Sequence, residues 1–593
     1  MYLKNVLAAA ASAMIAGAAF ASYPPAPAGT HLGGVIVTPY GHTPLVALID
    51  RAGKDATDIH VTVHGKGANG VPIAYNVGRK TFLDNDGIPI FGLYPNHTNE
   101  VTVTYKQQGK KVTDKYKIIT GAINTSYIDN RNLTALPTPV VKKVDPKFKD
   151  RLYFVNSGTL TPMGSDINWV MQKSKDAPKA SANPSGGSIP FQTVPLNYVV
   201  DTQGEFRWWW DPDAIFDARD IDLNKRGYGM GFHLTKAGTY TFVQGQKWYE
   251  MNFMGKIIAE HKLPRGYIDL SHSTWELPNG NILLRAAKSN YLRDDGQYVH
   301  TVRDHILEVD RMGNLVDVWD LNKILDNTRD DLIKALDLGA VCMNVDLTAA
   351  GTTVGSEPEA PFGDAAGVGA GRNWAHVNSV SYDPSDDSII ISARHQGVVK
   401  IGRDKQVKWI LAPSIGWKNG LEKKLLKPVD AKGKPISCTE VGECEGGFDF
   451  TYTQHAAWPS HSGRGNLTVF DNGQIRHYEK PALPSMNYSR IVEYKIDPKK
   501  MTVQQTWQYG QEFGADGFAP ITSNTTWMKD RDTMFGFWGS VGLFNQKQGT
   551  IGRLTEQDYK TKEMKVQIDI YNDKPASTHY QGFVFDPKKS FSK

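Results

Sequence analysis

Short runs of alternating apolar and polar residues, separated by turn residues, extend along most of the chain. In the N-terminal part the alternation predicts strands at 59–64 and 100–105, with Asn85-Asp86-Gly87 as a turn between them. Strands of this length and spacing, punctuated by Asp-Gly and proline, are typical of a small β-sandwich. We therefore expect a β-sandwich over residues 22–130 and a linker over 131–150, where prolines and lysines gather.

Beyond the linker a longer unit recurs, in which a polar residue precedes a strand, a tight turn and a returning strand. The clearest copies are 271–286, which begins Ser-His-Ser-Thr-Trp, and 375–394, which begins Ala-His-Val-Asn. A looser copy begins at His455, and another carries Asn524 in place of the histidine. Such repeats are typical of propeller blades, because each small sheet buries its faces only against its neighbours. The sequence predicts an all-β protein, with a six-bladed β-propeller over residues 151–593 after the sandwich.

Histidines occupy equivalent positions in three of these repeats, at His272, His376 and His455. A lone histidine at the start of a strand is more often a hydrogen-bonded structural residue than a catalyst. In a propeller, however, the inner strand of each blade begins near the central channel, so equivalent positions converge on the axis. We therefore predict that the three imidazoles meet in one site.

Two further residues are expected at that site. Asn378 lies on the same strand face as His376, and Arg394 ends the hairpin that begins there. A structural ion pair is the alternative role for Arg394. Because arginine offers a planar fork of donors and each imidazole offers up to two, the set suits a tetrahedral oxyanion such as sulfate or phosphate.

The N-terminus carries a lysine, an apolar run and Ala19-Phe20-Ala21, which together indicate a secretory signal peptide over residues 1–21. We expect an exported protein, located in the periplasm if the source is bacterial. No later stretch approaches the roughly eighteen unbroken apolar residues that a spanning helix requires. No membrane partner is therefore expected.

Three cysteines occur in the chain, and two of them, Cys438 and Cys444, lie in one Gly/Glu-rich loop. An oxidising compartment favours a short disulfide between these two. A metal site is the weaker interpretation, because no second close Cys or His pair accompanies them. Cys342 matches no motif.

The charge balance argues against a nucleic-acid partner. The formal net charge is +5 (67 − 62) over 593 residues, and basic residues are interspersed with acidic ones. A Gly-x-x-x-x-Gly-Lys-Ser/Thr phosphate loop is missing from the sequence, which argues against a nucleotide as the group donor.

The motifs together resemble those of the bacterial periplasmic arylsulfate sulfotransferases. The resemblance covers the mature chain and its order of sandwich and propeller. It rests on Leu277-Pro-Asn-Gly-Asn281, His376-x-Asn378, the Cys438/Cys444 loop before Gly446-Gly-Phe-Asp-Phe450, and Thr453-Gln-His455. It implies transfer of a sulfuryl group from an aryl sulfate donor to a phenol acceptor, with no cofactor, no metal and no nucleotide.

The resemblance also implies roles for the candidate residues. His455 becomes the nucleophile of a ping-pong reaction and forms a transient sulfohistidine. His272, His376, Asn378 and Arg394 hold the sulfuryl oxygens, and Thr522 also contacts substrate, with Thr525 as the alternative. A homodimer and maturation by a disulfide-forming oxidase are implied as well.

Two other functions are consistent with the repeats. In the first, the three histidines bind a transition metal and the propeller hydrolyses esters or transfers electrons. Arg394 beside the site would repel a cation, and no carboxylate recurs in the histidine motifs, so the pattern favours an oxyanion. In the second, the propeller is not catalytic and binds a partner or a sugar on its face.

Overall fold

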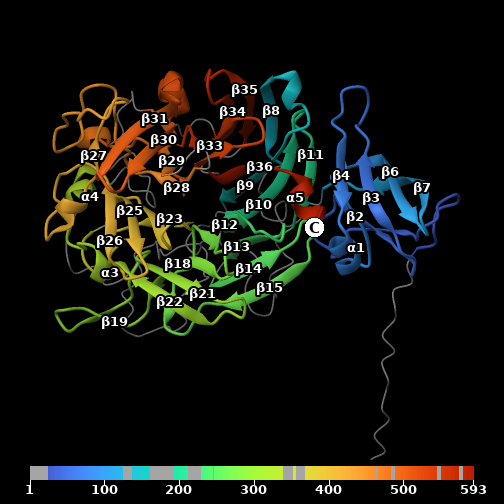
Figure 1. Cartoon of the computed structure of the whole chain (residues 1–593), viewed down its shortest axis with the longest axis horizontal. Helices are drawn as coiled ribbons and strands as arrows, with labels where there is room; N and C mark the ends of the chain where they lie inside the picture. Colours follow the sequence, from blue (N-terminus) through green and yellow to red (C-terminus); the bar gives the residue numbers. More distant parts are fainter. Residues whose placement is uncertain are drawn as a thin grey trace, which may run out of the picture.

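The computed structural model places eleven stretches of the chain (Figure 1). It describes residues 24–123, 136–160, 193–211, 229–244, 246–337, 351–354, 367–460, 465–482, 488–543, 549–572 and 578–593. The predicted signal peptide and Cys342 lie outside these ranges. Within them, every helix is too short or too polar to cross a membrane.

The N-terminal strands form two antiparallel sheets. One contains β1 (Val35–Val37), β2 (Val46–Asp50) and β5 (Gly87–Phe91), and the other contains β4 (Ile73–Val77), β3 (Thr57–Val63), β6 (His97–Gln107) and β7 (Lys110–Thr120). The short helix α1 (Arg79–Asp84) connects β4 to β5. Alternate residues of β3, β4 and β6 are buried, as expected of sheets with one face in the core. These sheets form the predicted sandwich, which is drawn in blue in Figure 1.

Six further sheets, each of four or five strands, make up the rest of the described chain. From the inside outward, the first contains β36 (Thr578–Phe585), β9 (Leu152–Leu160), β10 (Thr193–Asp201) and β11 (Phe206–Trp210), and the second contains β12 (Met230–Leu234), β13 (Tyr240–Gln244), β14 (Lys247–Met251) and β15 (Ile257–Lys262). The third contains β17 (Thr274–Glu276) and β16 (Tyr267–Ile268), both paired with β18 (Ile282–Lys288), then β21 (His305–Val309) and β22 (Leu315–Asp320), and the fourth contains β23 (Val377–Asp383), β24 (Ser388–Ala393), β25 (Gly397–Gly402) and β26 (Val407–Leu411). The fifth contains β28 (His455–Pro459), β29 (Asn466–Asp471), β30 (Arg490–Asp497), β31 (Thr502–Tyr509) and β27 (Lys427–Pro428), and the sixth contains β32 (Asn524–Met528), β33 (Thr533–Val541), β34 (Ile551–Asp558), β35 (Met564–Tyr571) and β8 (Thr138–Val144).

Short elements lie between these strands. They are the hairpin of β19 (Tyr291–Leu292) and β20 (Tyr298–Val299), the helices α3 (Leu321–Ile324), α4 (Asp331–Ala335) and α5 (Pro587–Phe591), and the 3-10 turns η1 (Pro146–Phe148), η5 (Leu421–Lys424), η6 (Arg476–Tyr478) and η7 (Gln511–Gly517).

The six inner strands form a closed ring of contacts. Each of β36, β12, β17, β23, β28 and β32 touches the next, and β32 touches β36 in turn. The prediction of an all-β chain with a six-bladed propeller and an N-terminal sandwich is therefore confirmed.

Two strands from distant parts of the chain complete the ring. β36, near the C-terminus, is the inner strand of the first blade, while β8 is the outer strand of the sixth. β8 lies inside the range 131–150 that was predicted as a linker, so part of that range belongs to the propeller instead. An edge strand needs only one ladder partner and tolerates proline and lysine, which is why its composition resembles that of a linker.

A buried ion pair joins the two blades at this closure. The Glu556 carboxylate, fully buried in β34, accepts hydrogen bonds from Nη2 of Arg151 at 2.6 Å and from the Tyr153 hydroxyl at 3.0 Å. Arg151 also pairs with Asp530, whose side chain is 52% exposed.

Glu556→Gln should lower the free energy of unfolding by about 3–5 kcal/mol, because it removes the buried carboxylate that compensates Arg151 and leaves only the exposed Asp530 as a charged partner. Urea unfolding followed by tryptophan fluorescence measures the change. Asp530→Asn removes the exposed partner of the same arginine and should cost less than about 1 kcal/mol. Equal losses in the two variants would contradict the assignment of Glu556 as the closing contact.

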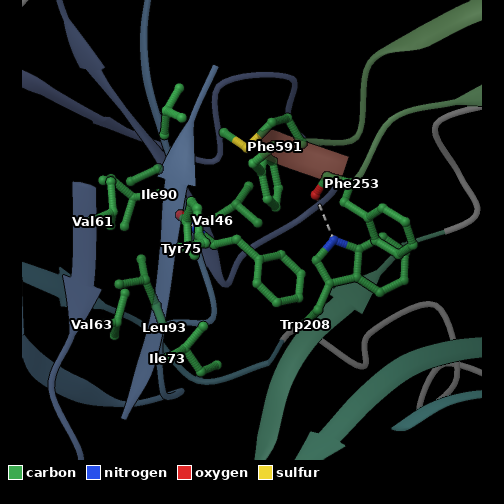
Figure 2. Close-up of a cluster of buried hydrophobic side chains, with 14 of the residues drawn as sticks. Val46, Val61, Val63, Ile73, Tyr75, Ile90, Leu93, Trp208, Phe253 and Phe591 are labelled. Atoms are coloured by element: carbon green, nitrogen blue, oxygen red, sulfur yellow. Dashed lines mark hydrogen bonds between the residues drawn. The ribbon is translucent and has the colours of Figure 1, made fainter. Parts of the chain in front are cut away.

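The sandwich and the propeller share one hydrophobic core. Figure 2 shows Trp208 and Phe253 of the propeller beside Val46 and Tyr75 of the sandwich, with Phe591 of α5 between them. The Trp208 indole N–H donates to the Phe253 carbonyl at 2.8 Å. The sandwich is therefore packed against the first two blades and the C-terminal helix.

Arg207 of β11 connects the same two regions through polar contacts. Its fully buried guanidinium donates to the carbonyls of Gly92 and Val71, both at 2.7 Å, and pairs with Asp201 at 2.8 Å. It also lies 3.8 Å from the centre of the Tyr94 ring. The interface thus buries apolar surface and also supplies hydrogen-bond acceptors and a carboxylate to the buried guanidinium of Arg207.

Candidate active site

The backbone turns left-handed where four consecutive blades begin their inner strands. The residues with positive φ are His272 (70°), His376 (48°), Thr453 (53°) and Thr522 (59°). Only a small left-handed region is open to non-glycine residues, and β-branched threonine is especially disfavoured there. Backbone strain of this kind concentrates at functional sites, where the surrounding structure maintains it.

The structure brings the three predicted histidines together. The ring centroids of His272 and His376 are 5.9 Å apart, and all three side chains are at least 95% buried. His272, Asn378 and His455 line one cavity of about 220 Å³. Aromatic side chains line the same cavity, including Trp275 and Trp458, whose ring centroids lie 6.3 Å apart.

His455 is the first residue of β28, and it is neutral. Its Nδ1 lies 2.7 Å from Oδ1 of Asn472. Burial, and then the nearby Arg394 guanidinium, lower the pKa of His455 to about 3. The imidazole therefore carries a lone pair at neutral pH.

Arg394 is fully buried behind His455. Its guanidinium donates to the Thr453 carbonyl at 2.8 Å, to Oε1 of Gln474 at 2.6 Å and to the Pro520 carbonyl at 3.3 Å. These contacts hold the cation between the segments that lead into the fifth and sixth blades.

His376 contacts a second buried arginine, Arg303. Nη1 of Arg303 lies 2.9 Å from Nε2 of His376, and the Asn373 amide contacts Nδ1 at 2.9 Å. Burial, and then Arg303, hold the pKa of His376 well below its ordinary value. His376 is therefore neutral in the free protein, and Nε2 accepts from Arg303 because a guanidinium only donates.

His272 is neutral for the same reasons. Burial, then Arg303 and Arg285, hold its pKa well below the ordinary value. Nδ1 of His272 faces the Ser271 hydroxyl and lies 3.4 Å from Nη2 of Arg285. The other terminal guanidinium nitrogen of Arg285, Nη1, pairs with Asp269 at 2.8 Å. Because Arg285 only donates, Nδ1 is the acceptor and the proton of His272 resides on Nε2.

Asn378 lines the cavity, whereas Thr522 is joined to the site through its backbone and Thr525 faces its own blade. Asn378 donates to the Gln454 carbonyl at 2.7 Å, while its buried Oδ1 accepts no hydrogen bond from the part of the chain that the structure describes. The Thr522 carbonyl accepts from the side chain of Asn472, the partner of His455. Thr525 instead donates to Phe535 within its own blade.

Sequence reasoning did not identify Arg303, Arg285 and Asn472. Arg303 precedes the third strand of its blade, Arg285 lies in the second, and Asn472 follows the second strand of the fifth blade. None of them occupies the repeat position of the histidines. An arginine within an otherwise apolar strand, as at Arg285, is a signal that could have indicated one of them.

The predicted disulfide is confirmed. Cys438 and Cys444 are bonded, with an S–S distance of 2.04 Å, in the loop before β28. Both half-cystines pack against a hydrophobic core that the fourth and fifth blades share, so the loop is fixed to it. For the alternative of a metal centre, the described residues contain no group of three His, Cys, Asp or Glu side chains arranged to hold an ion.

Comparison with known proteins identifies the family. Residues 138–581 match the arylsulfotransferase (ASST) family model, and residues 34–121 match the model of the arylsulfotransferase Ig-like domain. The chain is 57% identical over 576 residues to the Arylsulfate sulfotransferase AssT of Escherichia coli O6:H1 (strain CFT073), covering 97% of this chain and 96% of that protein. It is 53% identical over 590 residues to the Arylsulfate sulfotransferase AssT of Lelliottia amnigena, covering 99% and 98%.

Among solved structures, the periplasmic gluconolactonase of Pseudomonas aeruginosa aligns with 73% of this chain and 99% of its own, at 11% identity and a TM-score of 0.31. That likeness is too low to carry an argument. The family models and the two relatives, by contrast, span nearly all of the sequence. The chain therefore belongs to the arylsulfotransferase family.

Proposed function

We propose that this chain is an aryl sulfotransferase that moves a sulfuryl group from a phenolic sulfate to a phenol through a sulfohistidine at His455. The family and the names of both relatives support the reaction class. The observation that carries the mechanism is a buried, neutral His455 beside a fully buried guanidinium, in a cavity that it shares with His272.

In the first half-reaction, the Nε2 lone pair of His455 forms a bond to sulfur. The bond between sulfur and the aryl oxygen breaks, and its electron pair leaves with the phenolate, which takes a proton from solvent. Sulfuryl transfer, like phosphoryl transfer, spreads charge over the peripheral oxygens, so fixed donors supply most of the stabilisation. Arg394, and His272 through its Nε2–H, are the donors that we assign to this task.

In the second half-reaction, the acceptor phenol loses its proton to solvent and its oxygen attacks sulfur. The N–S bond breaks, and its electron pair returns to Nε2 of His455. Both steps run through one site in opposite directions, so the same donors serve each of them.

The size of the cavity supports this order of events. A cavity of about 150 Å³ takes up one benzene molecule, so a cavity of about 220 Å³ has room for one phenol ring. This size supports a ping-pong sequence, in which the first phenol leaves before the acceptor enters.

Incubation with a chromogenic aryl sulfate alone, without nucleotide, tests the proposal. We expect a burst of phenol equal to the enzyme concentration and a His455-containing peptide that is heavier by one sulfuryl group. Addition of a phenol should remove that mass. Inorganic sulfate, which has no aryl leaving group, is the control and should leave the peptide unchanged. Turnover without any adduct on this peptide would refute the covalent mechanism.

We also propose that the enzyme works in the periplasm. The residues of the expected signal peptide and the Cys438–Cys444 disulfide support an oxidising, exported compartment. Pairing of two chains, and the disulfide-forming oxidase, remain predictions from the family resemblance.

A further inference from the structure

The side chain of Asn472 is held in a single orientation. It follows β29 and is fully buried. Its amide nitrogen donates to the Ala519 carbonyl at 2.7 Å and to the Thr522 carbonyl at 3.1 Å. Rotating the amide by half a turn would place Oδ1 against these two carbonyl oxygens, so only one orientation is compatible with its surroundings.

The orientation of Asn472 determines the tautomer of His455. Oδ1 faces Nδ1 of His455 at 2.7 Å, and an amide oxygen only accepts. Nδ1 must therefore carry the proton, which leaves the lone pair on Nε2. A ring with the opposite tautomer would bring two acceptors together and would present an N–H to the sulfur.

The backbone around Asn472 is fixed as well. The Ser489 hydroxyl donates to the Asn472 carbonyl at 2.7 Å, and the Ala519 N–H donates back to that hydroxyl at 2.8 Å. The contact to His455 thus rests on a network that joins the fifth blade to the start of the sixth.

We propose that Asn472 is a positioning residue for His455, and that its neutral side chain keeps the sulfurylated imidazole reactive; this rests on the proposed function. Once Nε2 bonds to sulfur while Nδ1 keeps its proton, the ring is cationic. A carboxylate partner would stabilise that cation through a charge-assisted hydrogen bond, about twice as strong as a neutral one. The neutral amide orients the ring without stabilising the intermediate to the same degree.

Sequence reasoning gave Asn472 no role, because Asp471-Asn472-Gly473 is a common turn pattern. In the structure Asp471 accepts from Arg476 and Arg490, within the fifth blade. The adjacent Asn472 serves the site instead.

Two variants separate orientation from charge, with each half-reaction measured on its own. Asn472→Leu keeps the size and removes the acceptor, and we expect the phenol burst from donor alone to slow about a hundredfold or more. Asn472→Asp keeps an acceptor for Nδ1 of His455, although its second oxygen faces the Ala519 and Thr522 carbonyls. The burst should therefore slow less than in the leucine variant, while discharge of the adduct by phenol should slow at least about tenfold. The adduct should therefore accumulate during turnover of this variant.

The aspartate variant should also show a new pH dependence. His455 faces Arg394, Arg303 and the neutral His272, and among the described residues the main influences on its pKa include no carboxylate. A carboxylate at position 472 favours the protonated ring of His455, and the burst should fall as the pH drops through the raised pKa of that ring.

The control variant is Asn99→Leu, which removes a buried amide of the sandwich that bonds to Tyr94. This variant should lose stability and keep the rates of both half-reactions.

The outcomes are distinguishable. A wild-type burst rate in Asn472→Leu would overturn the positioning role. The role would also be overturned if Asn472→Asp behaved like Asn472→Leu, with no accumulated adduct and no loss of the burst at low pH. Absence of the adduct in the wild-type chain would instead overturn the proposed function, and this inference with it.

Discussion

Replacing His455 with alanine should reduce phenol release and acceptor sulfation together, by about 10⁴-fold or more, as expected when a nucleophile is removed. The variant lacks the only atom that we assign to attack on sulfur, and the remaining donors bind the sulfuryl group without an acceptor for it. Steady-state assays with a chromogenic aryl sulfate, with and without a phenol, measure both losses.

His261→Ala is the control for this variant. That ring lies on the outer strand β15, 4.9 Å from the Trp248 ring centroid, and its loss should leave turnover unchanged. Turnover near the wild-type rate in His455→Ala would disprove the covalent mechanism.

Arg394→Ala should lower kcat/KM for the donor by about 10²–10³-fold, since it removes a fixed donor to the charge that develops on the sulfuryl oxygens. It should also change the pH dependence, because Arg394 is the main charged group that lowers the pKa of His455. In the wild type the nucleophile is neutral above about pH 3, so its ionisation should not limit the rate between pH 5 and 8. In the variant the pKa rises, and the rate should fall as the pH decreases through the new value.

The measurement is kcat/KM across pH, with Arg531→Ala as the control. Arg531 pairs with Asp150 at 2.7 Å, near the surface between the first and sixth blades, and should have no effect. A uniform loss in Arg394→Ala, with an unchanged pH profile, would mean that Arg394 acts through the fold and not through the charge near His455.

Much of the architecture followed from repetition. The recurrent unit of polar residue, strand, turn and strand predicted six blades, and the equivalent positions of His272, His376 and His455 predicted their convergence. Repetition carries this information because a propeller places equivalent residues at equivalent distances from its axis. The disulfide followed from the short spacing of two cysteines and the expected compartment.

Contributions that do not repeat were not predictable in this way. Arg303 and Asn472 reach the site from strand ends where the residue type is not repeated: Asn472 follows β29 as Arg394 follows β24, but one is an amide and the other a guanidinium. Their residue types also suit ion pairs and turns. The composition of β8 predicts a linker, because an edge strand with a single ladder partner has a weak pattern. In each case the missing information is a contact between segments far apart in the sequence.

The position of β36 has a consequence for how the molecule is assembled. The strand that completes the first blade comes from residues 578–585, whereas its partner β9 comes from residues 152–160. Until it arrives, β9 has an unpaired edge and Phe154 lacks Phe583, the ring that stacks on it at 4.5 Å. The ring of blades therefore cannot close by pairing strands that are neighbours in the sequence, and its closing contact joins segments from opposite ends of the propeller domain.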